Sequence, residues 1–382
     1  MIRDIFNEDH DAFRETVRQF VAKEISPNVH DWENAGIVPR ELFTKAAEIG
    51  INGLQIPEQY GGGGVDTFKF NAIVLEENGY AAATLGGLQV HISTVLPYFL
   101  ELANEEQRER WFPGFADGTL VSSIAMTEPG TGSDLAGMAT TAVRDGDHYV
   151  LNGAKTFITG GINADLIVVV ARTSPAGENR RDGLSLLVVE AGMPGFTRGR
   201  NLDKLGLKAQ DTAELAFSDV RVPVANLLGE EGKAFGMLGA NLPQERLTIA
   251  VTAVATAVAA LNLAIDYVRE RKVFGQPVAH FQNTKFVLAE CATEIEAGQA
   301  MVDRAINALD AGKLTPADAA KTKLFCTEVQ SRVIDKCLQL HGGYGYMREY
   351  PITRLYADAR VSRIFGGTNE VMKSVVSKSL GL

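Results

Sequence analysis

The chain has 382 residues, 46% of them hydrophobic and 22% charged, which is typical of a globular protein with room for two or three domains. Its 37 basic residues against 47 acidic ones give a formal net charge of −10, which argues against nucleic acid or an anionic membrane surface as the main partner. The three cysteines form no C-x-x-C pair and the histidines are not clustered, which excludes a disulfide framework and a zinc site, so we expect no metal and a reducing, cytoplasmic location.

Residues 1–118 have helical patterning. The first ten residues are acidic and carry no apolar stretch, so we expect no targeting segment. Apolar residues at near-helical spacing, from Phe13 to Ile25, predict a first helix that Pro27 should stop. Further helices are predicted over 40–49, 67–80 and 104–112.

From 119 to 229 the pattern changes to short β-rich runs separated by Gly, Pro, Asn and Asp. Short strands at roughly ten-residue spacing predict a small β-sandwich or barrel. The expected strands are Val121–Met126, His148–Leu151, Leu166–Val170, Leu184–Val189 and Ala213–Phe217.

The helical period returns over residues 230–382 and predicts a four-helix bundle. Its most apolar run, Leu247–Ile265, is rich in Ala and Thr and contains an Asn, so we expect a buried bundle helix and no membrane span. The fold class is therefore α+β, in the order helical domain, β domain, helical bundle. The four expected bundle helices cover 231–272, 281–312, 316–341 and 352–362.

Two segments of the middle region have the chemistry of a ligand-binding loop. Ser123–Asp134 reads S-I-A-M-T-E-P-G-T-G-S-D, and its turn residues let backbone N–H groups approach a ligand closely. In the second segment, Lys155–Gly161, Phe157 and Thr159 share one face of a strand. An aromatic ring and a hydroxyl so placed can stack on a flat ring and bond its polar edge.

Three segments of the C-terminal region complete the pattern. Arg269–Pro277 ends a long helix with cations, which suit either helix capping or a pyrophosphate, with Gln282 as a neutral donor. Gln339–Gly345 and Phe365–Glu370 place paired glycines at helix boundaries, where backbone amides become free. His341 is expected to be a packed residue.

In this order and spacing the five segments closely resemble the acyl-CoA dehydrogenase family over essentially the whole chain. The resemblance implies an N-terminal helical domain, a middle β domain and a C-terminal four-helix bundle. It also implies a homotetramer built from two dimers, with FAD between the β domain and the bundle and the neighbouring subunit completing each site.

The resemblance also assigns site residues by position. Phe157 stands where the family usually has Trp against the flavin ring, and Thr159 would bond near flavin N5. Ser133 would lie near the pantetheine or the pyrophosphate, and Arg246 would lie near the CoA phosphates. Gly366 and Gly367 would also be substrate-binding residues. The cofactor-binding residues implied for the same subunit are Met126, Thr127, Gly132, Ser133, Phe157, Ile158, Thr159, Thr368 and Glu370. Those implied for the neighbouring subunit are Arg271, Phe274, Gln282, Gln339, Leu340, Gly342 and Gly343.

The expected reaction needs a carboxylate base over the Cα–Cβ bond in a dry site that raises its pKa. Many family members carry this Glu in an E-G-T triplet near the C-terminus, but here the triplet is Gly366-Gly367-Thr368. The long-chain and isovaleryl branches carry it on an earlier helix in an E-R-L context, which Glu245 matches. Glu245 is therefore the expected base, with Gly366 facing the thioester, whereas Glu370 and Glu128 are poorer candidates.

The implied function is FAD-dependent α,β-desaturation of a fatty or branched acyl-CoA to the trans-2-enoyl-CoA, as in fatty acid β-oxidation. Electrons would pass to an electron-transfer flavoprotein. Two alternatives stay open: a dehydrogenase of acyl or aminoacyl groups bound to a carrier protein, and a flavoprotein that binds acyl-CoA without turning it over. We expect acyl-chain length to depend on side chains between Tyr80 and Leu96.

Overall fold

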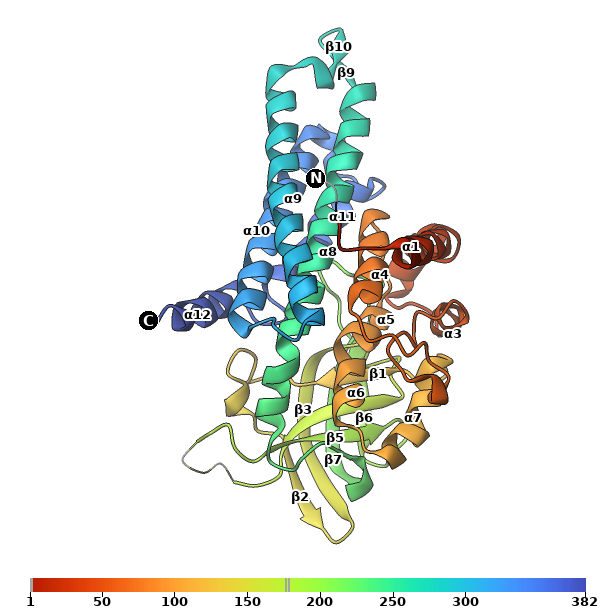
Figure 1. Ribbon diagram of the computed structural model, residues 1–382, viewed down its shortest axis with the longest axis vertical. Helices are drawn as coiled ribbons and strands as arrows, with labels where there is room; N and C mark the ends of the chain where they lie inside the picture. The colour runs from red at the N-terminus through yellow and green to blue at the C-terminus, as the bar shows by residue number, and fades with distance from the viewer. Residues whose placement is uncertain (1–2, 176, 178) are drawn as a thin grey trace.

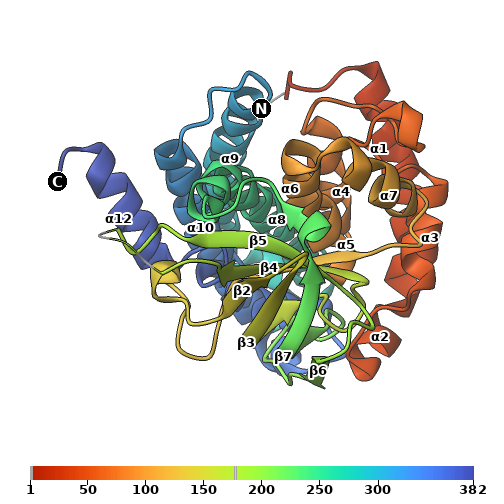
Figure 2. The ribbon, with the colours of Figure 1, turned by 90° about the horizontal axis from the view of Figure 1, so that it is seen from below.

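A computed structural model describes residues 3–175, 177 and 179–382; residues 1, 2, 176 and 178, which belong to the predicted helical and β regions, lie outside the described residues. The N-terminal helices lie beside the main β-sheet region, and the long C-terminal helices project away from it (Figure 1). Viewed from below, the N-terminal helices lie on one side of the strands and the bundle behind them (Figure 2).

The N-terminal region is helical, but the helical conformation that begins with α1 does not stop at Pro27, contrary to the prediction. A π turn (Val21–Ile25) and a 3-10 turn (Ser26–Asn28) lead directly into the next helix. Proline is tolerated here because it lies in the first turn of the 3-10 segment, where its missing N–H is not needed. The helices are α1 (Glu8–Phe20), α2 (Val29–Ala35), α3 (Glu41–Glu48), α4 (Lys69–Tyr80), α5 (Gly87–Val90), α6 (Leu96–Leu102) and α7 (Glu105–Ala116).

The middle region forms one eight-stranded sheet in the order β6-β7-β3-β2-β4-β5-β8, with β1 parallel to β4. The two halves of the sheet are joined by one residue pair between β2 and β4, and they share a core, so the sheet folds over on itself. The strands are β1 (Ser122–Ala125), β2 (Thr141–Asp145), β3 (His148–Thr159), β4 (Leu166–Arg172), β5 (Leu184–Glu190), β6 (Phe196–Asn201), β7 (Thr212–Pro223) and β8 (Leu227–Leu228).

Strands β4 and β5 are buried on both faces. In β4, Ile167 and Val169 pack inside the folded sheet, whereas Val168 and Val170 pack against aromatic residues of α6 and α7. This double burial explains why both strands are continuous apolar runs without alternation. The sheet is thereby fixed to the N-terminal helices.

The C-terminal region contains three long helices, and the predicted fourth bundle helix is only nine residues long. By length and composition α8 is long enough and apolar enough to cross a membrane, but 56% of its most apolar window is buried inside the protein, where it packs in the bundle core. The elements are α8 (Ala234–Glu270), β9 (Lys272–Val273), β10 (Gln276–Pro277), α9 (Gln282–Asp310), α10 (Pro316–Leu340), α11 (Pro351–Ala359) and α12 (Asn369–Ser379).

Helix α4 lies against α8 at very short range. A Cβ placed on Gly79 would stand 2.6 Å from the Ala255 Cβ, so only glycine permits this approach. Ala72 and Leu75 of α4 join the same core as Val251 and Val254 of α8. The N-terminal helices are therefore packed directly onto the helix that carries Glu245.

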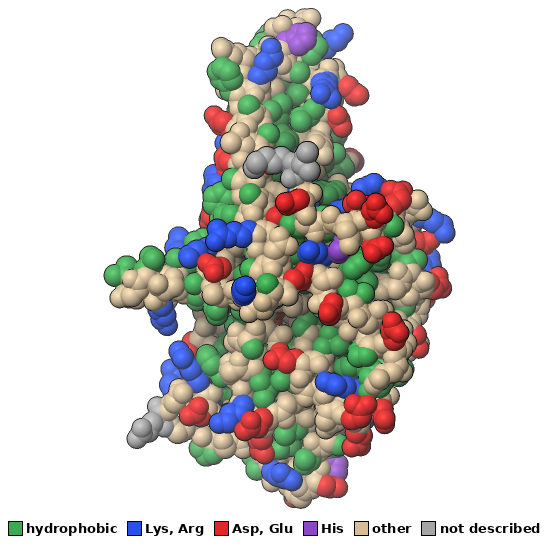
Figure 3. All heavy atoms as spheres, in the orientation of Figure 1, with side chains coloured by type: hydrophobic (Ala, Val, Ile, Leu, Met, Phe, Trp, Pro, Cys, Tyr) green, Lys and Arg blue, Asp and Glu red, His purple; other side chains and the backbone are tan. Residues whose placement is uncertain are grey.

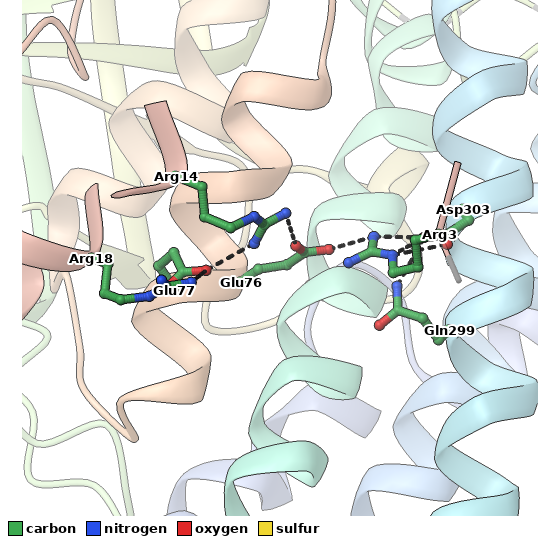
Figure 4. A network of polar contacts seen from close by, with 7 residues as sticks. All are labelled: Arg3, Arg14, Arg18, Glu76, Glu77, Gln299 and Asp303. Atoms are coloured by element: carbon green, nitrogen blue, oxygen red, sulfur yellow. Dashed lines mark hydrogen bonds and ion pairs between the residues drawn. The ribbon is translucent and has the colours of Figure 1, made fainter. Parts of the chain in front are cut away.

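A network of charges secures the same junction (Figure 4). Glu76 of α4, with a side chain only 2% exposed, pairs with Arg3 at 2.7 Å and with Arg14 at 2.8 Å. Arg3 also pairs with Asp303 of α9 at 2.6 Å, so the network joins the start of the chain, α4 and the bundle. A buried carboxylate that is paired in this way can stay ionised at low cost.

Replacing Glu76 by glutamine should therefore lower the free energy of unfolding by about 1–3 kcal/mol, because two arginines lose their charged acceptor. Urea unfolding would measure it. Glu15→Gln is a matched control, because Glu15 and its partner Arg18 are each more than half exposed and should contribute less than about 1 kcal/mol. Equal losses in both variants would contradict a stabilising role for the buried network.

Candidate active site

A cavity of about 230 Å³ lies where the three regions meet. Helix α8 provides one wall with Glu245, Thr252 and further residues on the same helical face. The β-sheet contributes Thr159, and the loop after α11 contributes Gly366. The structure thus brings together residues separated by more than a hundred positions in the sequence, including the expected base.

Glu245 is buried in the wall of this cavity, with 8% of the residue exposed. The Tyr98 hydroxyl donates a hydrogen bond of 2.6 Å to its Oε1 atom. Burial raises the pKa of the Glu245 carboxyl to about 7, while the Tyr98 hydrogen bond and the Arg246 charge act in the lowering direction. A carboxyl with this pKa is suited to act as a general base near neutral pH.

Gly366 and Gly367 form a loop with left-handed backbone, at φ +64° and +93°. A Cβ on Gly366 would lie 2.4 Å from the Ile249 Cδ1 atom, so a side chain there would meet α8 one turn beyond Glu245. Two buried cations hold the loop from below. Arg246 Nε donates to the Gly366 carbonyl at 3.4 Å, and Lys323 Nζ donates to the Gly367 carbonyl at 2.9 Å.

Arg246 is buried beside the glycine loop. Only 6% of Arg246 is exposed, and its guanidinium donates to the Gly366 carbonyl, so in this structure it supports the loop. Burial lowers its pKa, and the neighbouring Glu245 charge acts against that effect. Its expected place near the CoA phosphates stays a prediction.

The β-sheet side of the cavity carries Phe157 and Thr159 at the end of β3. Phe157 is 67% exposed and has a φ of +60°, which is strained for a residue other than glycine. Gln210 donates to the Thr159 hydroxyl at 3.3 Å. Ile158 is buried in the core of the folded sheet, so only its backbone can meet a ligand.

The loop Ser123–Asp134 is held by a buried ion pair. Lys155 Nζ lies 2.9 Å from Glu128 Oε1 and donates to the Met126 carbonyl at 3.0 Å. Glu128 also accepts hydrogen bonds from the backbone N–H groups of Ala139 and Thr140, so it is a structural residue and not a base. The Thr127 carbonyl accepts from the Thr156 N–H at 2.9 Å, and Gly132 and Ser133 are exposed at the loop tip.

The cofactor-binding residues expected from the neighbouring subunit lie elsewhere, at the far end of α8. Arg271, Leu340, Gly342 and Gly343 line a second cavity of about 400 Å³, and the Arg271 guanidinium stacks on the Tyr344 ring at 5.5 Å. Phe274, Gln282 and Gln339 are exposed near it, Phe274 by 95%. Basic side chains are visible around this tip (Figure 3).

His341 and the start of α12 have structural roles. His341 is buried, stacks on Tyr267 at 4.4 Å and bonds the Cys337 carbonyl, which agrees with its interpretation as a packed residue. Thr368 is the N-cap of α12 and accepts from the Val371 N–H. Glu370 is exposed in the first turn of that helix, outside the cavity lining.

Three residues of the site were not predicted from the sequence. Tyr98 lies in a helical stretch that the apolar pattern did not indicate, and only its position beside Pro97 could have suggested a helix start. Lys155 and Lys323 are buried lysines whose burial leaves no mark in the local sequence. Burial lowers the pKa of each ammonium to about 8.

The three regions of the chain match the three domains of one protein family. The models of the acyl-CoA dehydrogenase N-terminal, middle and C-terminal domains match residues 7–119, 123–220 and 233–381. The chain belongs to the acyl-CoA dehydrogenase family. It is 46% identical to the mitochondrial long-chain specific acyl-CoA dehydrogenase of Sus scrofa over 99% of this chain and 88% of that protein.

Solved structures show the same relationship. The crystal structure of acyl-CoA dehydrogenase from Geobacillus kaustophilus is 47% identical, covers 100% of both chains and superposes with a TM-score of 0.98. A chain from the structure of the electron transferring flavoprotein of Acidaminococcus fermentans is 36% identical, with 98% of both chains covered and a TM-score of 0.92. As a member of this family the protein is an FAD-dependent oxidoreductase that acts on acyl-CoA.

The chain's own residues fit FAD. Open space surrounds Gly130 and Gly132 of the Ser123–Asp134 loop and Gly342 and Gly343 at the second cavity, so their backbones are accessible to a ligand. Phe157 has a strained backbone and an exposed ring, and this ring lies at the first cavity, where a flat ligand can cover it. Arg271 provides a cation at the second cavity for an anionic group.

Proposed function

We propose that this enzyme desaturates a fatty or branched acyl-CoA to the trans-2-enoyl-CoA and passes the electrons to an electron-transfer flavoprotein. The observation that carries this proposal is the buried Glu245 carboxyl, whose pKa burial raises to about 7, in a cavity shared with Gly366 and Thr159. The identity to a long-chain specific enzyme supports a fatty acyl substrate. The match to a chain from an electron transferring flavoprotein structure supports the acceptor.

In the proposed reaction Glu245 removes the proton from the carbon next to the thioester carbonyl. FAD, when bound, would supply the acceptor for the hydride that leaves the neighbouring carbon. The Gly366 N–H is the proposed donor to the thioester oxygen, where negative charge develops. Arg246 and Lys323 keep that loop in place through its carbonyl groups. The buried walls exclude water from the carboxylate.

The positions of the two cavities support the proposed homotetramer. Arg271 caps the C-terminal end of α8 and follows Glu245 by 26 positions, which is about 39 Å at 1.5 Å per residue. We propose that the second cavity of one subunit holds the adenosine diphosphate half of the FAD bound at the first cavity of another. Figure 1 shows the β9–β10 tip at the opposite end of the molecule from the sheet.

Replacing Arg271 by alanine should weaken FAD retention about tenfold and lower the share of tetramer, because the second cavity loses its cation. The elution volume in gel filtration would measure the share of tetramer. Flavin absorbance per protein in the eluted fractions would measure FAD retention. Arg269→Ala is the matched control, since Arg269 is exposed in the last turn of the same helix and outside the second cavity. Normal cofactor content in Arg271→Ala would contradict the proposed shared site.

An anaerobic titration with butyryl-, isovaleryl-, octanoyl- and palmitoyl-CoA, monitored by flavin absorbance, tests the function. Bleaching by one of them would support desaturation and rank the acyl classes. The same thioesters on a carrier protein test the first alternative. Retained FAD without bleaching by any thioester would overturn the proposal and favour a binding-only flavoprotein.

A further inference from the structure

Tyr98 makes the one hydrogen bond to the Glu245 side chain among the described residues, at 2.6 Å from its hydroxyl to Oε1. Tyr98 is fully buried, and Glu245 is 8% exposed. The other carboxylate oxygen, Oε2, has no hydrogen-bond partner within the described part of the chain, although Glu245 lines the cavity. The two oxygens of the base thus have different environments.

The fold fixes the Tyr98 ring from several sides. A π turn (His91–Val95) precedes α6, and such a turn places one extra residue in the helical path and thereby rotates the next helix about its axis. His91 anchors that turn to β1 by a contact of 2.7 Å between its Nδ1 atom and the Ser122 Oγ atom. The ring of Tyr98 itself packs in the aromatic cluster that contains Phe99 and Trp111. The packing of its surroundings therefore holds the Tyr98 hydroxyl at Glu245.

Few charges act on this pair. On its own helix, Glu245 interacts electrostatically with Arg246. On α6, it accepts the hydrogen bond of Tyr98, and the charge of Glu101 also acts on Tyr98. Asp358 is the other acidic residue among the described residues that line the cavity. Burial and the Glu245 charge raise the pKa of Tyr98 well above its usual value, so the phenol stays protonated and remains a donor.

We propose that Tyr98 is a positioning residue for proton abstraction: it holds Oε1 and stabilises the ionised form of Glu245, which leaves Oε2 to receive the substrate proton. This inference rests on the proposed function, because it takes Glu245 as the base. A hydrogen bond to an ionised carboxylate is among the stronger ones in proteins, and in a buried site its loss favours the neutral acid.

Loss of the Tyr98 hydroxyl should raise the pKa of Glu245. Tyr98→Phe removes a donor to the charged form, so the Glu245 pKa should rise above about 7, by about one to two pH units. Flavin reduction should then be about five- to fiftyfold slower at about pH 7, because less base is ionised. At about pH 9 the rate should approach that of the wild type, since the base itself is intact.

The test combines kinetics with a direct titration. Anaerobic stopped-flow reduction is measured from about pH 6 to about pH 9 in the holoenzyme. Infrared difference spectroscopy, with Glu245→Gln as the blank, detects the protonated carboxyl of Glu245 without any turnover. Tyr60→Phe is the matched control, because the Tyr60 hydroxyl also donates to a carboxylate, Glu105, outside the cavity.

The expected result is an upward shift of both the kinetic and the infrared titration in Tyr98→Phe and of neither in Tyr60→Phe. Equal slowing of Tyr98→Phe at every pH, or an unshifted infrared titration, would overturn the proposal and leave Tyr98 a packing residue. If wild-type flavin is not bleached by any acyl-CoA while the infrared titration still shifts, the proposed function fails, and with it the role in proton abstraction.

Discussion

Replacing Glu245 by glutamine should slow flavin reduction by acyl-CoA by about 10²–10⁴-fold while FAD and acyl-CoA remain bound. Glutamine keeps the shape of the side chain and can still accept from the Tyr98 hydroxyl, but it cannot take up a proton. The wild-type rate should rise with pH through about pH 7, because the base must be ionised. Single-turnover reduction under anaerobic conditions would measure both effects.

Glu370→Gln is the control for this experiment. Glu370 is the acidic residue that comes after the Gly366–Thr368 loop, but it is exposed in the first turn of α12 and outside the cavity lining. Because Glu370 is also an expected cofactor-binding residue, the rate is measured per bound FAD, and on that basis it should stay within about twofold of the wild type. A fast Glu245→Gln enzyme together with a slow Glu370→Gln enzyme would show that the base is misassigned.

Replacing Lys155 by methionine should lower the free energy of unfolding by about 3 kcal/mol. The Lys155 side chain is fully buried and pairs with Glu128, whose side chain is 5% exposed. Methionine fills a similar volume, but it leaves the Glu128 carboxylate buried without its cation, and breaking a buried pair on one side is strongly destabilising. Because this pair holds the Ser123–Asp134 loop, FAD retention should fall as well.

Urea unfolding with flavin absorbance in parallel would measure this effect. Lys321→Met is the matched control, since Lys321 and Asp318 are both about half exposed and their pair should contribute less than about 1 kcal/mol. Adding Glu128→Gln to Lys155→Met should restore part of the stability, because the uncompensated charge is removed. No difference between Lys155→Met and its control would contradict the structural role of the pair.

Much of this site could be predicted because its pattern lies in short segments. The P-Q-E-R-L and G-G-T-N-E strings placed Glu245 opposite Gly366, and the structure brings both residues into one cavity. Long apolar runs such as β4 and β5 were readily identified as strands. In contrast, β2 and β6 were missed, because their side chains are largely exposed and show no apolar alternation.

The unpredicted parts of the site depend on tertiary contacts. Tyr98 reaches Glu245 only because a π turn and a helix with Pro97 near its start interrupt the regular helical period on which prediction relies. The hydrogen bond from Arg246 to the Gly366 carbonyl also joins residues more than a hundred positions apart, and no local pattern indicated it. The buried lysines 155 and 323 likewise owe their roles to partners distant in sequence.

The double burial of β4 and β5 limits which fragments of this protein can fold alone. One face of these strands completes the core of the sheet, and the other completes the aromatic core of α6 and α7. A fragment containing the strands alone would present a bare hydrophobic surface to water and would self-associate. The β region is thus recognisable as a sequence module, but we expect it not to fold without the helices α6 and α7 that cover it.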